Sequence, residues 1–210
     1  MLTRIEINSL KKQAQQIMKK NIINIILIQI IPIVFSNLFI TIFTNYYLSN
    51  HIDEGTLLII NYLCTIFIAI PLSYGVSKYL YNCTEDKQSY FDLVSSFKDG
   101  YIKIIATVLI SSLLLVNNII VVVITIILSF IFMYSDYILI KYSNLCFADT
   151  ISKCLNISKN NRINGVLIEI SFIPLLIVSC ILFFIPLIYV IPYIQLTKLL
   201  YIKEQDKKLN

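Results

Sequence analysis

The sequence predicts an all-α fold: a polytopic membrane helix bundle of six transmembrane helices arranged as three hairpins, with short amphipathic cytoplasmic helices. Three observations predict it. The 210-residue chain is 58% hydrophobic and only 14% charged, with a mean hydropathy of +0.80, whereas soluble domains are typically about 45–50% apolar and about 25% charged. Apolar runs long enough to cross a hydrocarbon core of roughly 30 Å recur along the chain. The basic residues fall only between particular runs.

The chain begins with a basic amphipathic helix over residues 1–20. Thr3-Arg4-Ile5-Glu6 has the capping-box pattern that opens a helix. Leu10, Ala14 and Ile17 then recur on one face of that helix, with four lysines around them. Two interpretations fit this pattern equally: a helix that lies on the membrane surface, and a solvated leader to the first span.

The apolar runs define the six spans. The first covers about 22–44 and the second about 56–80, where Pro71 and Gly75 bend or loosen the helix end. Each of the two later runs would be about 60 Å long as one helix, which is twice the hydrocarbon core. We therefore expect each to form two spans within a single membrane domain over 1–210, and the four resulting spans are 102–116, 119–140, 163–183 and 185–202.

The distribution of lysine and arginine predicts the orientation. All 17 basic residues lie in four segments: the two ends of the chain, the segment between spans two and three, and the segment between spans four and five. The three remaining turns carry none. The positive-inside rule places such clusters in the cytoplasm, and only an even number of spans keeps all four there. We expect a multi-pass protein of the cell membrane with both termini cytoplasmic.

Two further short helices are expected on the cytoplasmic side. One begins at Ser89, where Asp92 three residues later completes a cap, and ends at Gly100. Its apolar stripe consists of Phe91, Val94 and Phe97, which we expect to dock against the bundle; the alternative is a loop whose phenylalanines enter the lipid headgroups. The other runs over about 147–158.

The candidate functional site is a polar cluster within the membrane. Asp136 and Glu169 are the only acidic residues within spans, and both lie near the inner ends at similar depth. The basic residues near the same level are Lys103, Lys141, Arg162 and Lys198. The acids fit a cation or proton site that opens to the cytoplasm, or structural ion pairs with these basic residues.

Residue types needed for common catalytic and metal sites are scarce. His51 is the only histidine, and its neighbours are Asp53 and Glu54. Metal ligands normally come from three or four groups, so one histidine with two carboxylates in a turn is a weak candidate for a metal site. The five cysteines form no Cys-x-x-Cys pair, and no glycine-rich phosphate loop occurs. We therefore expect no catalytic, cofactor-binding or metal-binding residues and no cofactor. The basic residues form no single patch, so nucleic acid is not an expected partner.

These features favour a non-catalytic protein of the cell envelope. Besides the lipid bilayer, its expected partner is another membrane protein or a second copy of the chain, in envelope maintenance or immunity-type protection against membrane-active peptides. The alternative is a small transporter or transporter subunit, with Asp136 and Glu169 in its pathway. A lipid-modifying enzyme is the third hypothesis.

Short motifs along the whole chain also resemble a known family. They are Thr3-Arg4-x-Glu6-Ile7, Pro71-x-x-x-Gly75, Phe91 with Phe97, Tyr134 with Tyr137-Ile138-Leu139, Ser171-Phe172-Ile173, and Ile191-Pro192-Tyr193-x-x-x-Thr197-x-x-x-Tyr201. In their order and spacing the chain resembles bacterial six-span membrane proteins of domain-of-unknown-function family 975. It departs from the family's pattern at 124–130, which lacks Pro-Gly, and at Asn160, where the family tends to have glycine. The resemblance implies a fold and a membrane location but no activity.

Overall fold

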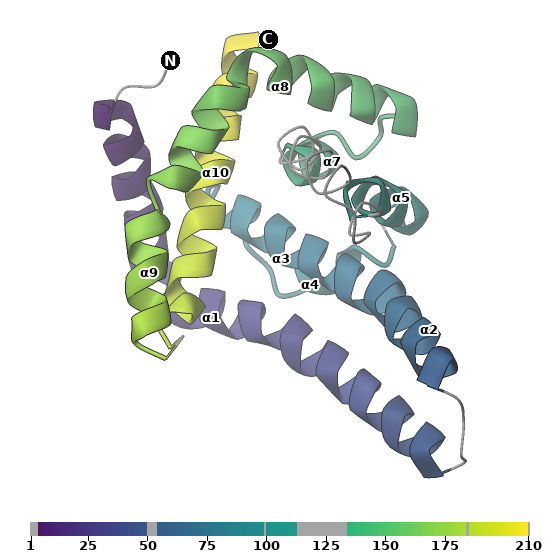
Figure 1. Cartoon of the computed structure of the whole chain (residues 1–210). Coiled ribbons are helices and arrows are strands. Elements are labelled where there is room, and N and C mark those ends of the chain that lie inside the picture. The colour runs from purple at the N-terminus through teal and green to yellow at the C-terminus, as the bar shows by residue number, and fades with distance from the viewer. Residues whose placement is uncertain (1–3, 50–53, 99, 113–133, 184, 210) are drawn as a thin grey trace.

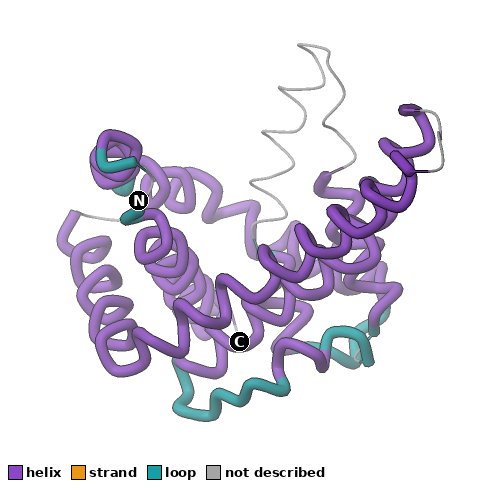
Figure 2. The backbone as a smooth tube through the Cα atoms, turned by 90° about the horizontal axis from the view of Figure 1, so that it is seen from below, coloured by secondary structure: helices purple, strands orange, loops and turns teal. Residues whose placement is uncertain are grey.

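A computed structural model describes residues 4–49, 54–98, 100–112, 134–183 and 185–209. The secondary structure of this part of the chain is helical throughout, which confirms the all-α part of the predicted fold class. Figures 1 and 2 show helices joined by short loops, with no strand in the described ranges. The elements are α1 (Arg4–Ser49), α2 (Glu54–Cys64), the π-helix η1 (Thr65–Ala69), α3 (Ile70–Cys83), α4 (Asp92–Ser95), α5 (Tyr101–Ser112), α7 (Ser135–Lys141), α8 (Phe147–Ile170), α9 (Ile173–Ile181) and α10 (Leu187–Leu209).

Three stretches of the described chain are long and apolar enough to cross a membrane: Arg4–Tyr46, Ile59–Cys83 and Ile163–Ile181. They contain or overlap the expected spans 22–44, 56–80 and 163–183. Expected span three is described over 102–112, as most of α5, whereas expected span four is described only over 134–140. Expected span six overlaps α10, and neither α5 nor α10 is among the three stretches. The count of six spans and their pairing as hairpins stay predictions.

Helix α1 is kinked at Asn21, whose backbone dihedrals (φ −130°, ψ 26°) are not helical. The kink falls between the expected basic helix and the expected first span. The apolar stripe of the N-terminal half, which includes Leu10, Ala14 and Met18, is buried in the main core, where this half packs against α10. Ile17, on the same expected face, is partly buried against this core. Protein therefore covers most of the stripe, and the placement of the helix at the membrane surface or in solvent stays a prediction.

The main core joins α1, α3, α7, α8 and α10. It contains large tyrosines whose hydroxyls have hydrogen-bond partners. Tyr134 donates to the Asn161 carbonyl oxygen at 3.2 Å, and Tyr201 donates to Asn161 Oδ1 at 3.2 Å. Because a buried hydroxyl without a partner is costly, these bonds fix how α7 and α10 meet α8.

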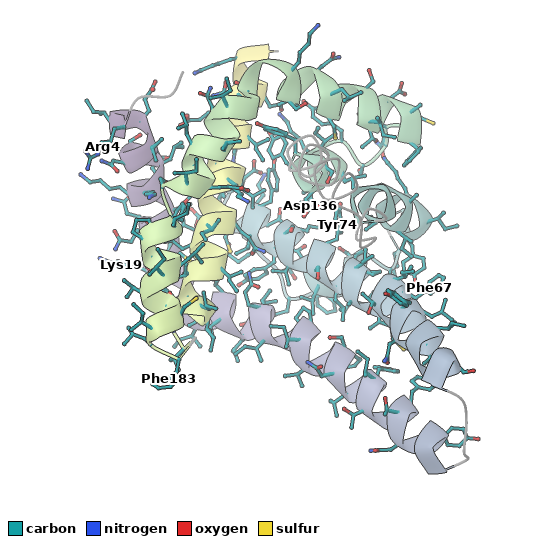
Figure 3. The ribbon with its side chains drawn as sticks, viewed as in Figure 1. Arg4, Lys19, Phe67, Tyr74, Asp136 and Phe183 are labelled. Atoms are coloured by element: carbon teal, nitrogen blue, oxygen red, sulfur yellow. The ribbon has the colours of Figure 1, made fainter. Side chains whose placement is uncertain are left out.

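Outside this core, the helices expose a large apolar surface. Phe67 and Phe183 mark two parts of it (Figure 3). The exposed residues on α1, α2, η1, α9 and the turn after α9 include Ile23, Leu27, Ile33, Val34, Phe35, Leu38, Ile42, Ile59, Leu63, Phe67, Ile177, Ile181, Leu182, Phe183 and Ile185. Monomeric soluble proteins rarely expose such extended apolar patches. This surface is compatible with lipid contact and supports association with a membrane.

The expected change in the helix near Pro71 occurs one turn earlier, where the hydrogen-bond pattern is that of the π-helix η1. Proline has no backbone N–H, so the Phe67 carbonyl, four residues before it, lacks its usual α-helical donor. The Tyr101 hydroxyl donates to that carbonyl oxygen at 2.8 Å. The start of α5 is thereby tied to η1, within the second candidate span.

The segment around α4 docks against α3, but through a different face than expected. The expected contact between Ser89 and Asp92 is formed, since the Ser89 backbone N–H donates to Asp92 Oδ2 at 3.1 Å, but the helix covers only Asp92–Ser95 and not the expected 89–100. The side chain of Leu93, only 6% exposed, faces the bundle, whereas Phe91 is 84% exposed. The prediction that the segment docks through its stripe of Phe91, Val94 and Phe97 was therefore wrong.

Glycine explains which face is buried. A Cβ atom at Gly75 would lie 2.5 Å from the Leu93 carbonyl oxygen and 2.7 Å from Leu93 Cα. Only a residue without a side chain permits this approach of backbone to α3. The contact places Leu93 inward, so the phenylalanines on either side of it point outward.

Candidate functional site

The expected intramembrane cluster is divided among separate helix contacts. Asp136, on α7, accepts a hydrogen bond from Ser77 Oγ of α3 at 2.8 Å. Figure 3 shows Asp136 in the region between α7 and α3, with Tyr74 nearby. No ion pair among the described side chains includes Asp136.

Glu169 forms an ion pair with Lys198, which joins α8 to α10. Both side chains are partly exposed, at 39% for Glu169 and 25% for Lys198. The pair neutralises the charge of Glu169 without removing it from solvent or headgroups. Of the four basic partners considered from the sequence, the structure brings Lys198 to this acid.

Two other expected members lie elsewhere. Lys103 donates to the carbonyl oxygens of Leu145, at 2.5 Å, and Ser143, at 3.3 Å, in the loop between α7 and α8. These bonds tie the first turn of α5 to that loop. The side chain of Arg162 lies outside the described part of the structure.

The last expected member, Lys141, belongs to a network that the sequence did not predict. Its ammonium forms an ion pair with Asp206 of α10, whose side chain is 1% exposed. The same carboxylate accepts hydrogen bonds from the hydroxyls of Tyr137, at 3.0 Å, and Tyr142, at 3.1 Å. Burial alone would raise the pKa of Asp206, but these donors outweigh burial and hold that pKa below its usual value.

A second ion pair continues this network to α3. Lys203 Nζ lies 3.1 Å from Glu85 Oε1 and 3.1 Å from Thr84 Oγ1, just beyond the end of α3. The hydrogen bond from Lys203 is the main cause that lowers the pKa of Glu85. We call the four charged residues Glu85, Lys141, Lys203 and Asp206 the terminal network, because two of them lie in the last turns of α10.

The sequence contained a signal for Asp206 that was not recognised. Leu199, Ile202 and Asp206 follow at i, i+3 and i+7 on α10, so Asp206 continues the buried face of that helix. It lies in a run rich in charges, Lys203 to Lys208, which is typical of a solvated end. A carboxylate in register with a buried stripe needs a cationic partner, and Lys141 supplies one.

Polar amides in the expected spans also serve helix contacts. Gln29 Nε2 donates to Gln195 Oε1 at 2.6 Å, which links α1 to α10. The Tyr90 hydroxyl donates to Asn24 Oδ1 at 2.8 Å, just beyond the kink of α1. Such bonds between helices are worth about 0.6–2 kcal/mol each. Asn117 and Asn118 lie outside the described residues.

No group of three metal-ligating side chains occurs within the described ranges. The side chains of His51, Asp53 and Glu54 fall outside them. The described part of the chain includes an open cavity of about 390 Å³ beside Lys11 and Phe172 and another of about 430 Å³ beside Asp149 and Asp206. The polar groups are therefore arranged chiefly as donors and acceptors between helices.

Comparison with family models, curated proteins and solved structures gave no match to this chain.

Proposed function

We propose that this chain is a non-catalytic, six-span protein of the bacterial cell membrane that binds a protein partner at its cytoplasmic face. Both termini lie in the cytoplasm in this proposal, as the basic clusters and the resemblance to family 975 imply. The role is one in envelope maintenance or immunity-type protection. One observation carries it: a rigidly held segment that exposes aromatic side chains.

The partner surface is the outward face of residues 90–97. Tyr90, Phe91, Val94 and Phe97 are all exposed there, although large aromatic side chains are usually covered. The segment is anchored from beneath, since Asn82 Nδ2 donates to Asp92 Oδ2 at 2.8 Å and Lys78 Nζ donates to Ser95 Oγ at 2.7 Å. A surface held in place before binding loses little conformational entropy when a partner docks.

The charges at the edge of this surface indicate the partner's chemistry. Lys98, just after the segment, is exposed, and Lys87, just before it, is exposed and pairs with Glu85 at 3.5 Å, whereas Asp92 of the segment is buried beneath. The partner that fits is a protein segment with apolar side chains and an acidic rim. Apolar residues would supply the area, and the rim charges would orient the encounter.

Photo-crosslinking tests this surface. With the photoreactive residue benzoyl-phenylalanine at position 91, irradiation of cells is expected to give one discrete protein adduct of higher mass. The matched control is the same residue at position 159, which is exposed on another helix, α8, away from the aromatic face, and it is expected to give a much weaker adduct. Crosslinks to lipid alone, with no protein adduct at position 91, would contradict partner binding and favour insertion of the phenylalanines into headgroups.

Asp136 supports the alternative of a transporter. Its carboxylate accepts a hydrogen bond from the Ser77 hydroxyl but takes part in no ion pair among the described residues. For a partner-binding protein, vesicles that contain the purified chain should conduct protons, Na⁺ and K⁺ no faster than empty vesicles. A pH-sensitive dye inside the vesicles measures this. Flux that disappears in both Asp136→Asn and Glu169→Gln would establish the alternative.

A further inference from the structure

The cavity of about 390 Å³ lies where the basic half of α1 meets the break between α8 and α9. Its volume falls within the range of roughly 300–1,000 Å³ that is typical of small-molecule sites. The walls are formed by Phe172, Pro174, Leu175, Val178 and Tyr193, and Lys11 is the one charged residue that lines it. The site thus combines one cation with an apolar wall.

The ammonium of Lys11 is held in a fixed position. Its Nζ donates to the Ser171 carbonyl oxygen at 2.7 Å and lies 4.1 Å from the centre of the Phe172 ring. The Tyr193 hydroxyl donates to the Lys11 carbonyl oxygen at 3.3 Å, which fastens this turn of α1 to α10. Phe172 and Tyr193 belong to two separate sequence motifs, and both contact this lysine.

Neither contact of the ammonium balances its charge. The carbonyl and the ring are both neutral, and no ion pair among the described residues includes Lys11. An ammonium has three N–H donors, and the Ser171 carbonyl accepts from only one. A half-buried cation beside apolar walls is costly unless an anion accompanies it.

The apolar wall continues onto the outer surface of α9. Leu175 and Val178 are exposed, as are Ile177 and Ile181 farther along the same helix, and α9 belongs to the candidate span Ile163–Ile181. On the other side, α1 exposes basic residues that include Lys12. A charged surface that passes into an apolar one is the setting of a membrane interface.

We propose that this cavity binds an anionic phospholipid. The phosphate accepts a hydrogen bond from the Lys11 ammonium, and an acyl chain lies along Pro174, Leu175 and Val178. Charge complementarity selects the anionic headgroup, and the adjoining lipid-exposed surface supplies the chain. The inference rests on the proposed membrane location but not on partner binding at residues 90–97, so the crosslinking result leaves it unaffected.

Native mass spectrometry of the purified full chain in detergent tests the site, with dioleoyl-phosphatidylglycerol as the probe. We expect a one-to-one lipid adduct for the wild type and for Lys11→Arg, which keeps the charge. Lys11→Met keeps the length but removes the charge-assisted hydrogen bond, so binding should weaken about tenfold or more. Lys12→Met, on the exposed face of the same helix, is the matched control and should bind as the wild type does.

Competition distinguishes the possible ligands. Dioleoyl-phosphatidylcholine and inorganic phosphate should displace the bound phosphatidylglycerol poorly, because one lacks the net charge and the other lacks the chain. If Lys11→Met does not fold, Val178→Trp fills the cavity without touching the lysine and should abolish the adduct. Wild-type affinity in the folded Lys11→Met or Val178→Trp variant, or equal displacement by inorganic phosphate, overturns the proposal.

Discussion

Replacement of Asp206 by alanine is expected to destabilise the folded protein by about 3–5 kcal/mol, which is the usual effect of removing one partner of a buried ion pair. The Lys141 ammonium and the buried Tyr137 hydroxyl would both lose their acceptor. The Lys141 side chain is 31% exposed, so its ammonium can recover some hydration, and the lower end of this range is expected. Thermal or denaturant unfolding in detergent measures the change.

Glu204→Ala supplies the matched control for this variant. Glu204 is an exposed carboxylate two residues earlier on the same helix, and its loss should change the free energy of unfolding by no more than about 0.5 kcal/mol. The double variant Asp206→Ala/Lys141→Met should recover part of the lost stability, because no unpaired ammonium remains. Equal stabilities for Asp206→Ala and Glu204→Ala would refute the structural role of the terminal network.

The same carboxylate predicts how stability depends on pH. The pKa of Asp206 is lowered in the folded state from a usual value of 3.8, so the folded state favours the ionised form. Its contribution is complete above about pH 4 and is lost as the pH falls through the lowered pKa. The Asp206→Ala variant should therefore lose less stability than the wild type on acidification below about pH 4.

Gly75→Ala is expected to be the second most damaging of these substitutions, by about 1–3 kcal/mol. The new Cβ would lie 2.5 Å from the Leu93 carbonyl oxygen, and backbone on both sides of the contact must move apart. The expected results are lower stability and faster proteolysis within residues 84–98. Ser73→Ala, at an exposed position on the same helix, should leave both quantities unchanged. A Gly75→Ala variant as protected as Ser73→Ala would show that α4 does not dock through Leu93.

Local signals predicted much of the helical organisation because they act over a few residues. The polar Asn21 separates a basic stretch from an apolar one, and α1 kinks there. The hydrogen bond between Ser89 and Asp92 is likewise formed, although α4 begins at Asp92 and ends at Ser95, well before Gly100. Pro71 was expected to bend or loosen its helix, because proline removes a backbone donor whichever partners surround it, and the π-helix η1 lies just before it.

Which face of a short helix is buried could not be predicted in the same way. The stripe of Phe91, Val94 and Phe97 has greater hydrophobicity than Leu93, and burial by hydrophobicity alone would favour it. The decisive factor is Gly75, 18 positions away in the chain, whose missing side chain admits the Leu93 backbone. A preference set by one close backbone approach leaves no periodic pattern in the segment itself.

The partners of the charged residues were also decided by tertiary structure. Lys198 and Lys141 were both expected near the two membrane acids, yet one pairs with Glu169 and the other with Asp206. Depth along the membrane normal, which residue counting can approximate, does not determine which helices are neighbours. Asp136 instead meets the hydroxyl of Ser77, on a helix that the charge pattern did not single out.

The most direct test of the proposed topology uses impermeant maleimide labelling of single-cysteine variants in whole cells. Cys146 is the native probe, because it is exposed and lies between the expected spans four and five, whereas Cys83 is buried and unsuitable. A second variant replaces all five native cysteines and carries Asp53→Cys in the expected first outer turn. Six spans with cytoplasmic termini predict that position 53 is labelled in intact cells and Cys146 only after permeabilisation. Labelling of Cys146 in intact cells would contradict the topology and the cytoplasmic partner surface with it.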